Sequence, residues 1–267
     1  MKCPICVNSM RVCFTARVLH KYSAEYEVCD SCGFLRAKEP HWLDEAYSSA
    51  IAAADTGLVG RNTMIADKIA GALYWATPTH GHGRYLDAAG GYGMLTRLMR
   101  DSGFDFYWSD KHCQNLLAGQ FEYSSSLGPC DAVTAIEVME HLVDPVEFID
   151  DTLKLAGSDT LIFTTELYEG AVPKPDAWWY YTFATGQHIG FFKKQTLQTV
   201  GKRLGLQFYS ANGLHVLSRK ALEPRLLEWA TGRWTAQIGA RWIRRRLGSK
   251  TLSDHEAILQ MAEHKPE

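Results

Sequence analysis

The sequence has little net charge and no long hydrophobic run, and each shortage excludes a class of protein. Its 28 Lys and Arg residues nearly balance its 30 Asp and Glu residues, so the net charge of −2 gives no overall attraction to nucleic acid. No apolar run approaches the roughly 20 residues of a membrane-spanning helix. The first residues, Met1–Pro4, have no apolar signal core, so we expect a cytoplasmic protein rather than a secreted one.

The composition is that of a folded protein. Hydrophobic residues make up 46% and aromatic residues 12% of the 267 residues, which is enough for one large α/β domain with a small appendage. The chain has seven cysteines, and four of them stand in two close pairs. This spacing indicates metal ligation in a reducing compartment rather than a disulfide framework.

The cysteine pairs define an N-terminal module over residues 1–40. Each C-x-x-C pair can place two thiolates about 2.3 Å from one tetrahedral zinc ion, and the four ligands are Cys3, Cys6, Cys29 and Cys32. Alternation over 12–19 and 22–28 predicts a hairpin between the pairs. Because all four ligands are sulfur, we expect a structural zinc. The alternative is four free buried cysteines in a module that is too small to fold easily without metal.

Two helical segments flank the main domain. Residues 41–82 predict helices and a linker, with a break at Gly57 and Gly60 and apolar positions at 42, 46, 47, 50, 51, 64, 65, 69, 73 and 74. Residues 221–267 predict a basic helical tail with an apolar stripe at Trp229, Trp234, Ile238 and Trp242. Such a helix docks on a protein partner or on an anionic membrane. The alternative is a helix that packs on its own domain with its arginines in water.

Residues 83–220 alternate between strand and helix patterns. This order predicts a doubly wound α/β domain with a mostly parallel sheet covered on both faces. The expected strands are 84–88, 105–109, 131–137, 159–165, 206–211 and 214–219, and the expected helices are 92–102, 112–119, 144–156 and 193–204. Ligands of such sheets bind beyond the carboxyl ends of the strands, where Asp87, Asp110 and Glu137 stand.

A glycine turn follows the first of these strands. Residues 85–95 read as a short strand, a turn that contains Gly91 and Gly93, and the start of a helix, and Asp110 closes the next strand. Such a turn lets the backbone approach a ligand, and the helix N-terminus offers it free N–H groups. An acid at the end of the next strand suits a ribose diol. The pattern therefore predicts a nucleoside-bearing cofactor.

Two motifs identify the cofactor by resemblance. The run from Leu86 to Gly93 resembles the first motif of class I S-adenosylmethionine (SAM)-dependent methyltransferases, Asp/Glu-x-Gly-x-Gly-x-Gly, with Ala89 in place of the first glycine. An alanine is tolerable there if its φ is negative. The run Asp131–Leu142 is similar to the family's fourth-strand motif, D-x-V-x-x-x-x-V-L-E-H-L. The resemblance implies SAM as cofactor and a Rossmann-like sheet of the seven-stranded type.

A narrower resemblance rests on the N-terminal cysteine pairs and on a segment around His188. The chain is similar to methyltransferases with a four-cysteine N-terminal zinc-ribbon-like module, which include deoxysugar C-methyltransferases and the type 11–23 methyltransferase group. The run Gly186–Phe192 is similar to the E-H-x-x-x-F segment that carries their catalytic histidine, with Gln187 in place of the acid. The resemblance implies that His188 is the general base, whose ordinary pKa near 6.5 suits proton transfer close to neutrality. The alternative is a structural His188 that bonds a backbone carbonyl within an aromatic cluster.

The resemblance also implies roles for the remaining candidates. Asp110 holds the ribose hydroxyls or is a simple strand cap. The amides of Gly91 and Gly93 contact the cofactor beside Ala89, or the two glycines only form the turn, and Asp87 anchors that turn. Phe121 flanks the adenine or is a core residue, Glu137 lies beside the cofactor, and Arg61 pairs with the cofactor carboxylate or is a surface arginine. His141 orients a loop or takes part in catalysis, and Tyr181 is a weaker acid–base candidate. The aromatic loop 166–192 covers the site or closes the core.

We therefore predict a methyltransferase that acts on a small-molecule acceptor, such as a sugar, a nucleotide-linked sugar or another secondary metabolite. Two alternatives stay open. One is an RNA methyltransferase whose zinc module grips the substrate, against which the near-neutral charge argues. The other is a non-catalytic zinc scaffold that retains SAM as a structural ligand.

Overall fold

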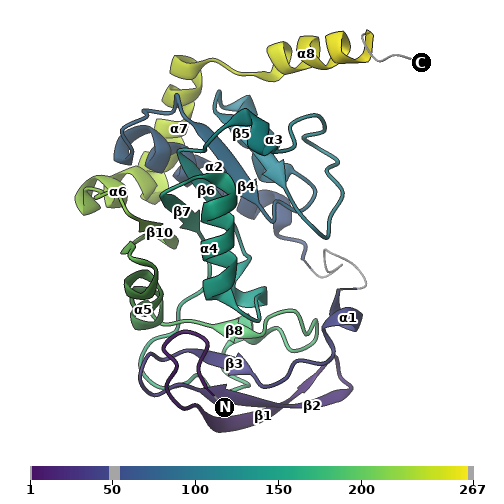
Figure 1. Cartoon of the computed structure of the whole chain (residues 1–267), viewed down its shortest axis with the longest axis vertical. Coiled ribbons are helices and arrows are strands. Elements are labelled where there is room, and N and C mark those ends of the chain that lie inside the picture. Colours follow the sequence, from purple (N-terminus) through teal and green to yellow (C-terminus); the bar gives the residue numbers. More distant parts are fainter. Residues whose placement is uncertain (1, 48–54, 264–267) are drawn as a thin grey trace.

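The computed structural model describes residues 2–47 and 55–263, with side chains up to residue 261. Positions 50 and 51 of the expected helical segment lie outside the described residues. The described residues form two sheets, a small one at the N-terminal end of the molecule and a larger one above it (Figure 1). The division of the chain into a module over residues 1–40, a helical segment, a main domain and a tail stays a prediction.

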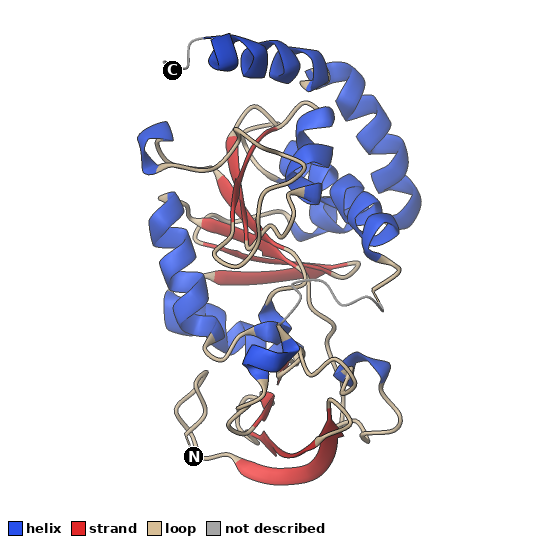
Figure 2. Ribbon diagram, turned by 90° about the vertical axis from the view of Figure 1, so that its right-hand side faces the viewer, coloured by secondary structure: helices blue, strands red, loops and turns tan. Residues whose placement is uncertain are grey.

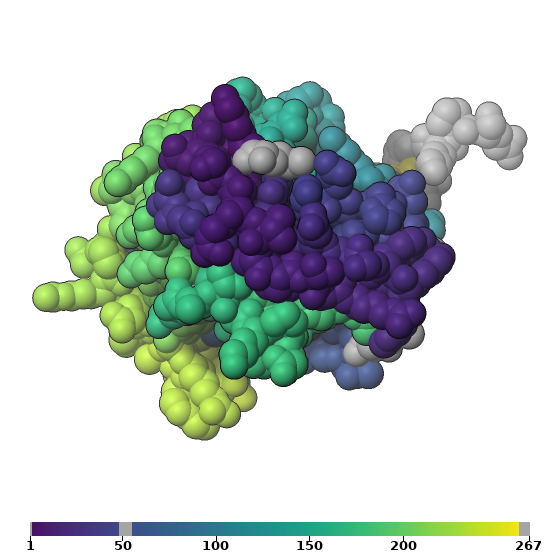
Figure 3. Space-filling view, turned by 90° about the horizontal axis from the view of Figure 1, so that it is seen from below, coloured from purple at the N-terminus to yellow at the C-terminus, as the bar shows by residue number. Residues whose placement is uncertain are grey.

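The small sheet has four antiparallel strands among the described residues. β1 (Arg11–Val18) and β2 (Tyr22–Val28) form the predicted hairpin, and β3 (Leu35–Ala37) extends it. The fourth strand, β8 (Gly190–Phe191), comes from far along the chain and pairs with β3. The module is thus completed by the loop 166–192, whose residues lie against the N-terminal residues in Figure 3.

The larger sheet, whose strands are red in Figure 2 with helices on either side, has the strand order β5-β4-β6-β7-β10-β9. β5 (Asp105–Ser109), β4 (Arg84–Ala88), β6 (Ala132–Ala135) and β7 (Thr160–Phe163) are parallel. β10 (Leu214–Ser218) is antiparallel to β7 and to the edge strand β9 (Gln207–Ala211). The mostly parallel sheet predicted from the sequence is confirmed, and each expected strand is present.

The sheet has six strands within the described residues instead of the seven that the resemblance implies. At the expected seventh position, beyond β5, the chain forms a single parallel bridge between Trp108 and Glu122. Only two backbone bonds of 2.8 Å, from the Trp108 N–H to the Phe121 carbonyl and from the Tyr123 N–H to the Trp108 carbonyl, support this contact. The 3₁₀ turn η2 (Ser125–Leu127) then leads the chain away before a strand can form.

The predicted helix over 112–119 is wrong. Asp110 accepts bonds from the backbone N–H groups of His112 and Cys113, and the Asn115 side chain bonds both the N–H and the carbonyl of Ala118. Such local bonds from a side chain to the backbone compete with the hydrogen bonds of a helix. The segment is therefore an irregular loop that packs beside the glycine turn.

Helices cover both faces of the larger sheet, as predicted. The buried side chains of α4 (Pro145–Ala156) and α5 (Lys194–Leu204) share one core with the sheet and the module's cysteines. The other core joins the sheet to α2 (Leu58–Gly71), α3 (Met94–Asp101) and the C-terminal helices. The short α1 (Leu43–Ala46) and the π-helical turn η1 (Ala72–Ala76) complete this part of the chain. Gly57 precedes α2, whereas Gly60 lies inside its first turn rather than breaking it.

Within residues 221–263, the basic tail forms three helices, α6 (Pro224–Thr231), α7 (Arg233–Leu247) and α8 (Thr251–Glu263). Ala240 and Ile243 of α7 are buried in the core that also contains α2, so this helix packs on its own domain. Trp234 and Ile238 of the predicted stripe stay 68% and 67% exposed, on the side away from that core. Among the described residues, none of the helices combines the length and hydrophobicity that crossing a bilayer requires.

Candidate functional site

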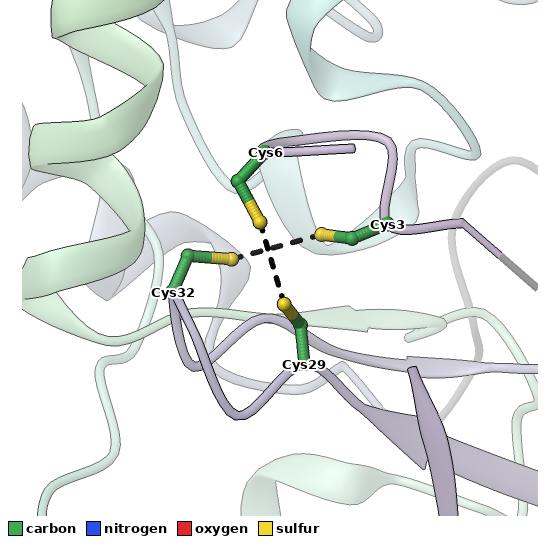
Figure 4. Close-up of side chains that lie close together, drawn as sticks. All are labelled: Cys3, Cys6, Cys29 and Cys32. Atoms are coloured by element: carbon green, nitrogen blue, oxygen red, sulfur yellow. Dashed lines mark hydrogen bonds between the residues drawn. The ribbon is translucent and has the colours of Figure 1, made fainter. Parts of the chain in front are cut away.

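The four predicted zinc ligands lie together at the end of the module. The sulfur atoms of Cys3, Cys6, Cys29 and Cys32 are within 4.8 Å of one another and point toward a common centre (Figure 4). The Sγ atoms of Cys3 and Cys32 are 3.6 Å apart, and those of Cys6 and Cys29 are 3.4 Å apart. Thiolates about 2.3 Å from a tetrahedral zinc ion stand about 3.8 Å from each other, so this donor set fits zinc.

The main domain holds the second cysteine knuckle in place. Thr196 of α5 donates a 2.7 Å hydrogen bond to the Cys32 carbonyl, and Tyr168 donates one to the Gly33 carbonyl. Gly33 has a φ of +76°, a conformation that a residue with a side chain rarely adopts. The hydrogen bond between the two thiols lowers the pKa of Cys3 to about 5 and raises the pKa of Cys32, so this pair favours one thiolate and one thiol.

The glycine turn after β4 has the left-handed backbone that the motif requires. Gly91 has a φ of +55° and Gly93, which begins α3, has a φ of +85°. A Cβ on Gly91 would meet no heavy atom within 4 Å, so its backbone faces open space. Ala89 has a φ of +52°, so the condition of a negative φ at this position is not met, and the residue is strained.

Asp110 connects the two halves of the predicted cofactor site. Its Oδ2 accepts a 2.9 Å hydrogen bond from the Gly91 N–H, and its Oδ1 accepts bonds of 2.7 and 2.9 Å from the N–H groups of His112 and Cys113. A carboxylate has about four acceptor positions, so three bonds leave room for one more. Asp110 therefore orders the turn and keeps capacity for a ligand hydroxyl.

Asp87, on β4, supports the glycine turn. The side chain is buried and accepts hydrogen bonds from Thr96 of α3 at 3.0 Å and from Thr134 of β6 at 2.8 Å. Burial raises the pKa of Asp87 to about 6, although the two threonines lower it. The carboxylate thus joins strand, helix and turn.

Phe121 and Arg61 already have partners within the chain. The Arg100 guanidinium lies 3.7 Å from the ring centroid of Phe121, which is buried. Arg61 makes two hydrogen bonds to Asp55, of 3.1 and 2.8 Å, and its Nε lies 4.0 Å from Oε2 of Glu137. The Arg61 fork therefore faces the carboxyl edge of β6 but is held by an acid of the same chain.

Glu137 lies in the turn that follows β6 and has a strained conformation, with a φ of +54°. Its Oε1 accepts a 2.6 Å hydrogen bond from Thr164, which follows β7. Since β4 and β6 are adjacent and parallel, Glu137 and the glycine turn lie at the same edge of the sheet. Ligands of doubly wound folds bind at this edge.

A second group of side chains lies directly after Glu137. Glu140 and His141 are in the 3₁₀ turn η3 (Met139–His141), and His188 comes from the loop that precedes β8. One donor atom of each of the three residues lies within 4.8 Å of the others. A 2.8 Å bond from the Ile189 N–H to the Glu140 carbonyl joins the two segments. The fold therefore brings together His141 and His188, two residues predicted separately from the sequence.

These three side chains are strongly perturbed by burial. Burial, and after it the charge of Glu137, raise the pKa of Glu140 to about 8. Burial lowers the pKa of His141 to about 4, and burial together with His141 lowers the pKa of His188 to about 3. Both imidazoles are thus neutral near pH 7, and His188 is a weaker base than an exposed histidine.

Tyr181 lies in a different environment from His188. Its hydroxyl donates a 2.8 Å hydrogen bond to the Pro173 carbonyl, and its ring stacks on Phe183 in the core of the small sheet. The preceding residue, Tyr180, has its ring centroid 4.6 Å from that of His188. The buried aromatic residues of the loop 166–192 close a core, as one of the two sequence interpretations proposed.

Glu140 was not among the site residues predicted from the sequence, although it lies within the fourth-strand motif Asp131–Leu142. The adjacent Glu140 and His141, which follow a strand end of the kind where ligands bind, could have indicated a site there. Nothing in the local pattern indicates that His188, 47 residues after His141, meets this pair.

Comparisons with known proteins give the family. The model of the methyltransferase domain family matches residues 61–211, which is more than half of the chain. A search of curated proteins finds no significant match. Structural matches include TnmH, with 17% identity, a TM-score of 0.46, and coverage of 68% of this chain and 62% of that one.

Two further structural matches have similar scores. Magnesium protoporphyrin IX methyltransferase from Synechocystis is 14% identical, with a TM-score of 0.41 and coverage of 66% of this chain and 91% of that one. An O-methyltransferase family 2 protein from Planctomyces limnophilus is 15% identical, with a TM-score of 0.46 and coverage of 70% and 63%. This chain thus spans less than two thirds of two of the three structures, and scores of this size carry no argument about its substrate.

The match over 61–211 begins in α2 and ends with β9, and it contains the glycine turn, Asp110 and the group around Glu140. The chain therefore belongs to the methyltransferase domain family and is an enzyme.

Proposed function

We propose that the enzyme transfers a methyl group from SAM to a small-molecule acceptor and carries a structural zinc ion in its N-terminal module. The observation that carries the cofactor assignment is the bond between Gly91 and Asp110. It joins the left-handed turn, which starts α3, to the acid that closes β5. A ligand that contacts the turn with its methionyl end and Asp110 with its ribose fits this arrangement.

Zinc fits the four cysteine sulfurs by donor type and by spacing. A site with four sulfur ligands has no open coordination position for a substrate, so the ion contributes to folding and not to the chemistry. The near-neutral net charge of −2 supports a small acceptor rather than RNA, since phosphate binding requires clustered Lys and Arg.

Methyl transfer is an in-line displacement at a sulfonium, so positioning of the acceptor and exclusion of water provide much of the rate. We propose that the group formed by Glu140, His141 and His188 positions and activates the acceptor. It lies at the edge of the sheet where the cofactor turn also lies, and Arg61 and Glu137 border it. Glu140 is fully buried, so bulk water does not reach its carboxyl group.

Calorimetry with S-adenosylhomocysteine, the stable product of SAM, tests the cofactor site. Asp110→Asn keeps one oxygen for the backbone N–H groups but loses the charge, so it should weaken binding about 10- to 100-fold, the worth of a charged hydrogen bond of about 1.5–3 kcal/mol. Asp151→Asn, at an exposed position of α4, is the matched control. Equal affinity of Asp110→Asn and the wild type would reject the ribose role.

A further inference from the structure

The group formed by Glu140, His141 and His188 contains an unpaired buried carboxylate. Glu140 has 0% exposure, and neither oxygen has a hydrogen-bond partner among residues 2–47 and 55–263. The hydroxyls of Thr165 and Tyr180 lie close enough to influence it, but neither makes a hydrogen bond of normal geometry with it. A carboxylate taken out of water without partners costs several kcal/mol, so the fold keeps it for a reason other than packing.

Protonation of Glu140 does not remove the difficulty. A protonated carboxyl group is a donor and needs an acceptor within about 3 Å. The nearest imidazole nitrogen, Nε2 of His141, is 4.0 Å from Oε1. A further group that fits between the carboxylate and the imidazoles satisfies both.

The two imidazoles are held in the tautomer that binds a cation. Nδ1 of His141 lies 3.0 Å from the Gln187 carbonyl, and Nδ1 of His188 lies 2.7 Å from the Tyr180 carbonyl. A carbonyl oxygen only accepts, so each Nδ1 carries the hydrogen and each neutral ring keeps its lone pair on Nε2. Metal-binding histidines commonly have this arrangement, in which a backbone carbonyl fixes the ring.

The distances suit a single ion. Ligand atoms that surround an ion at about 2.0–2.2 Å lie about 3–4 Å from each other. The donor atoms of the three residues are within 4.8 Å of one another, and the two rings are nearly perpendicular, with an interplanar angle of 82°. Small side-chain movements bring the three atoms into coordination range.

From these observations we propose that Glu140, His141 and His188 bind a divalent transition-metal ion, such as Mn²⁺, Fe²⁺ or Zn²⁺, beside the cofactor turn. Two imidazoles and one carboxylate leave coordination positions open for a substrate. The inference rests on the proposed function and gives it a substrate class: acceptors that bind the ion through a hydroxyl oxygen. The ion lowers the pKa of that hydroxyl, and the proton leaves to water.

The transfer then balances without another reactant. The acceptor oxygen forms a bond to the methyl carbon of SAM, the bond between carbon and sulfur breaks, and its electron pair stays on sulfur as a neutral thioether. The enzyme is thus predicted to be an O-methyltransferase whose acceptors include vicinal diols and catechols, which offer two oxygens to one ion.

Binding of Mn²⁺ tests the site directly. Mn²⁺ prefers oxygen and nitrogen ligands over four thiolates, and a zinc ion in the cysteine site is silent in electron paramagnetic resonance. We expect the zinc-loaded protein to bind one Mn²⁺ per chain, and Glu140→Gln and His188→Ala to weaken this binding at least about tenfold. Circular dichroism confirms that each variant is folded, and His141→Ala replaces any variant that is not.

Exposed residues supply matched controls. Glu147→Gln on α4 and His255→Ala on α8 change the same residue types outside the group and should leave Mn²⁺ affinity unchanged. Absence of Mn²⁺, Fe²⁺ and Zn²⁺ binding beyond the cysteine site would overturn the proposal, as would binding that Glu140→Gln and His188→Ala leave intact. Binding of S-adenosylhomocysteine to the wild type separates the two hypotheses, because its absence would contradict the cofactor site at Gly91 and Asp110 and leave the metal site untouched.

Discussion

Loss of the zinc ion should loosen the segment that carries His188 while the cofactor turn stays intact. The contacts form a chain from the metal to the histidine. Cys32 is followed by β3, β3 pairs Leu35 with Phe191 of β8, and His188 lies two residues before that strand. The substitution Cys32→Ser removes one zinc ligand and therefore acts at the metal end of this series of contacts.

The structure gives the size of the effect. Phe191 is fully buried, and its burial stabilises β8 by about 2–3 kcal/mol. The two residue pairs between β3 and β8 add about 1 kcal/mol for each net hydrogen bond. Loss of about 4 kcal/mol corresponds to about a 1000-fold rise in the population in which β8 is detached.

Hydrogen exchange measured by mass spectrometry tests this, together with metal analysis. Peptides that cover residues 187–192 should lose about 1000-fold protection in Cys32→Ser. Peptides of the turn 84–95 and the affinity for S-adenosylhomocysteine should stay within about twofold. Cys13→Ser is the matched control, since Cys13 lies on β1 and its Sγ donates to the Tyr26 carbonyl, a bond that serine preserves. A zinc-free variant with unchanged protection at 187–192 would refute the reasoning.

Two further predictions concern the turn itself. Ala89→Gly should raise the free energy of unfolding by about 1 kcal/mol in urea denaturation, because Ala89 has a φ of +52° and glycine adopts this conformation without strain; a decrease, as we expect for the control Ala177→Gly, would contradict this. The pKa of Asp87 is about 6 in the folded protein, above its ordinary value of 3.8. Its contribution to the free energy of unfolding is therefore complete below pH 4 and is lost as the pH rises through 6, a loss of about 3 kcal/mol. Urea denaturation between pH 4 and 7 should show this loss in the wild type and not in Asp87→Asn. The same dependence of the free energy of unfolding on pH in both proteins would argue against it.

Local patterns were sufficient for much of the fold. The strands around Leu86, Val133 and Leu161 were predictable because short apolar runs between turn residues define buried parallel strands. The helix over 112–119 was not predictable in this way, because its failure depends on side-chain bonds from Asp110 and Asn115 to a backbone that the periodicity alone describes as helical.

The candidate site was also predictable only where its residues have a local sequence pattern. Gly91 and Asp110 were predictable, since a turn and a strand end have local signatures, and the structure joins them by one hydrogen bond. Tyr181 was named for its residue type, but its neighbour Tyr180 is the one beside His188. Which of two adjacent aromatic residues faces a site depends on the path of the loop, which the sequence pattern does not specify.

By itself, the sequence determined the cysteine knuckles, the glycine turn and the alternation of strands and helices, because each rests on spacing along a few residues. Only the tertiary structure decided that the loop 166–192 completes the N-terminal sheet and that Glu140, His141 and His188 meet at the end of β6. The physical reason is that these contacts join residues far apart in the chain. These contacts form because they bury apolar surface and fit the shape of the whole molecule, so the spacing of residues along the chain does not predict them.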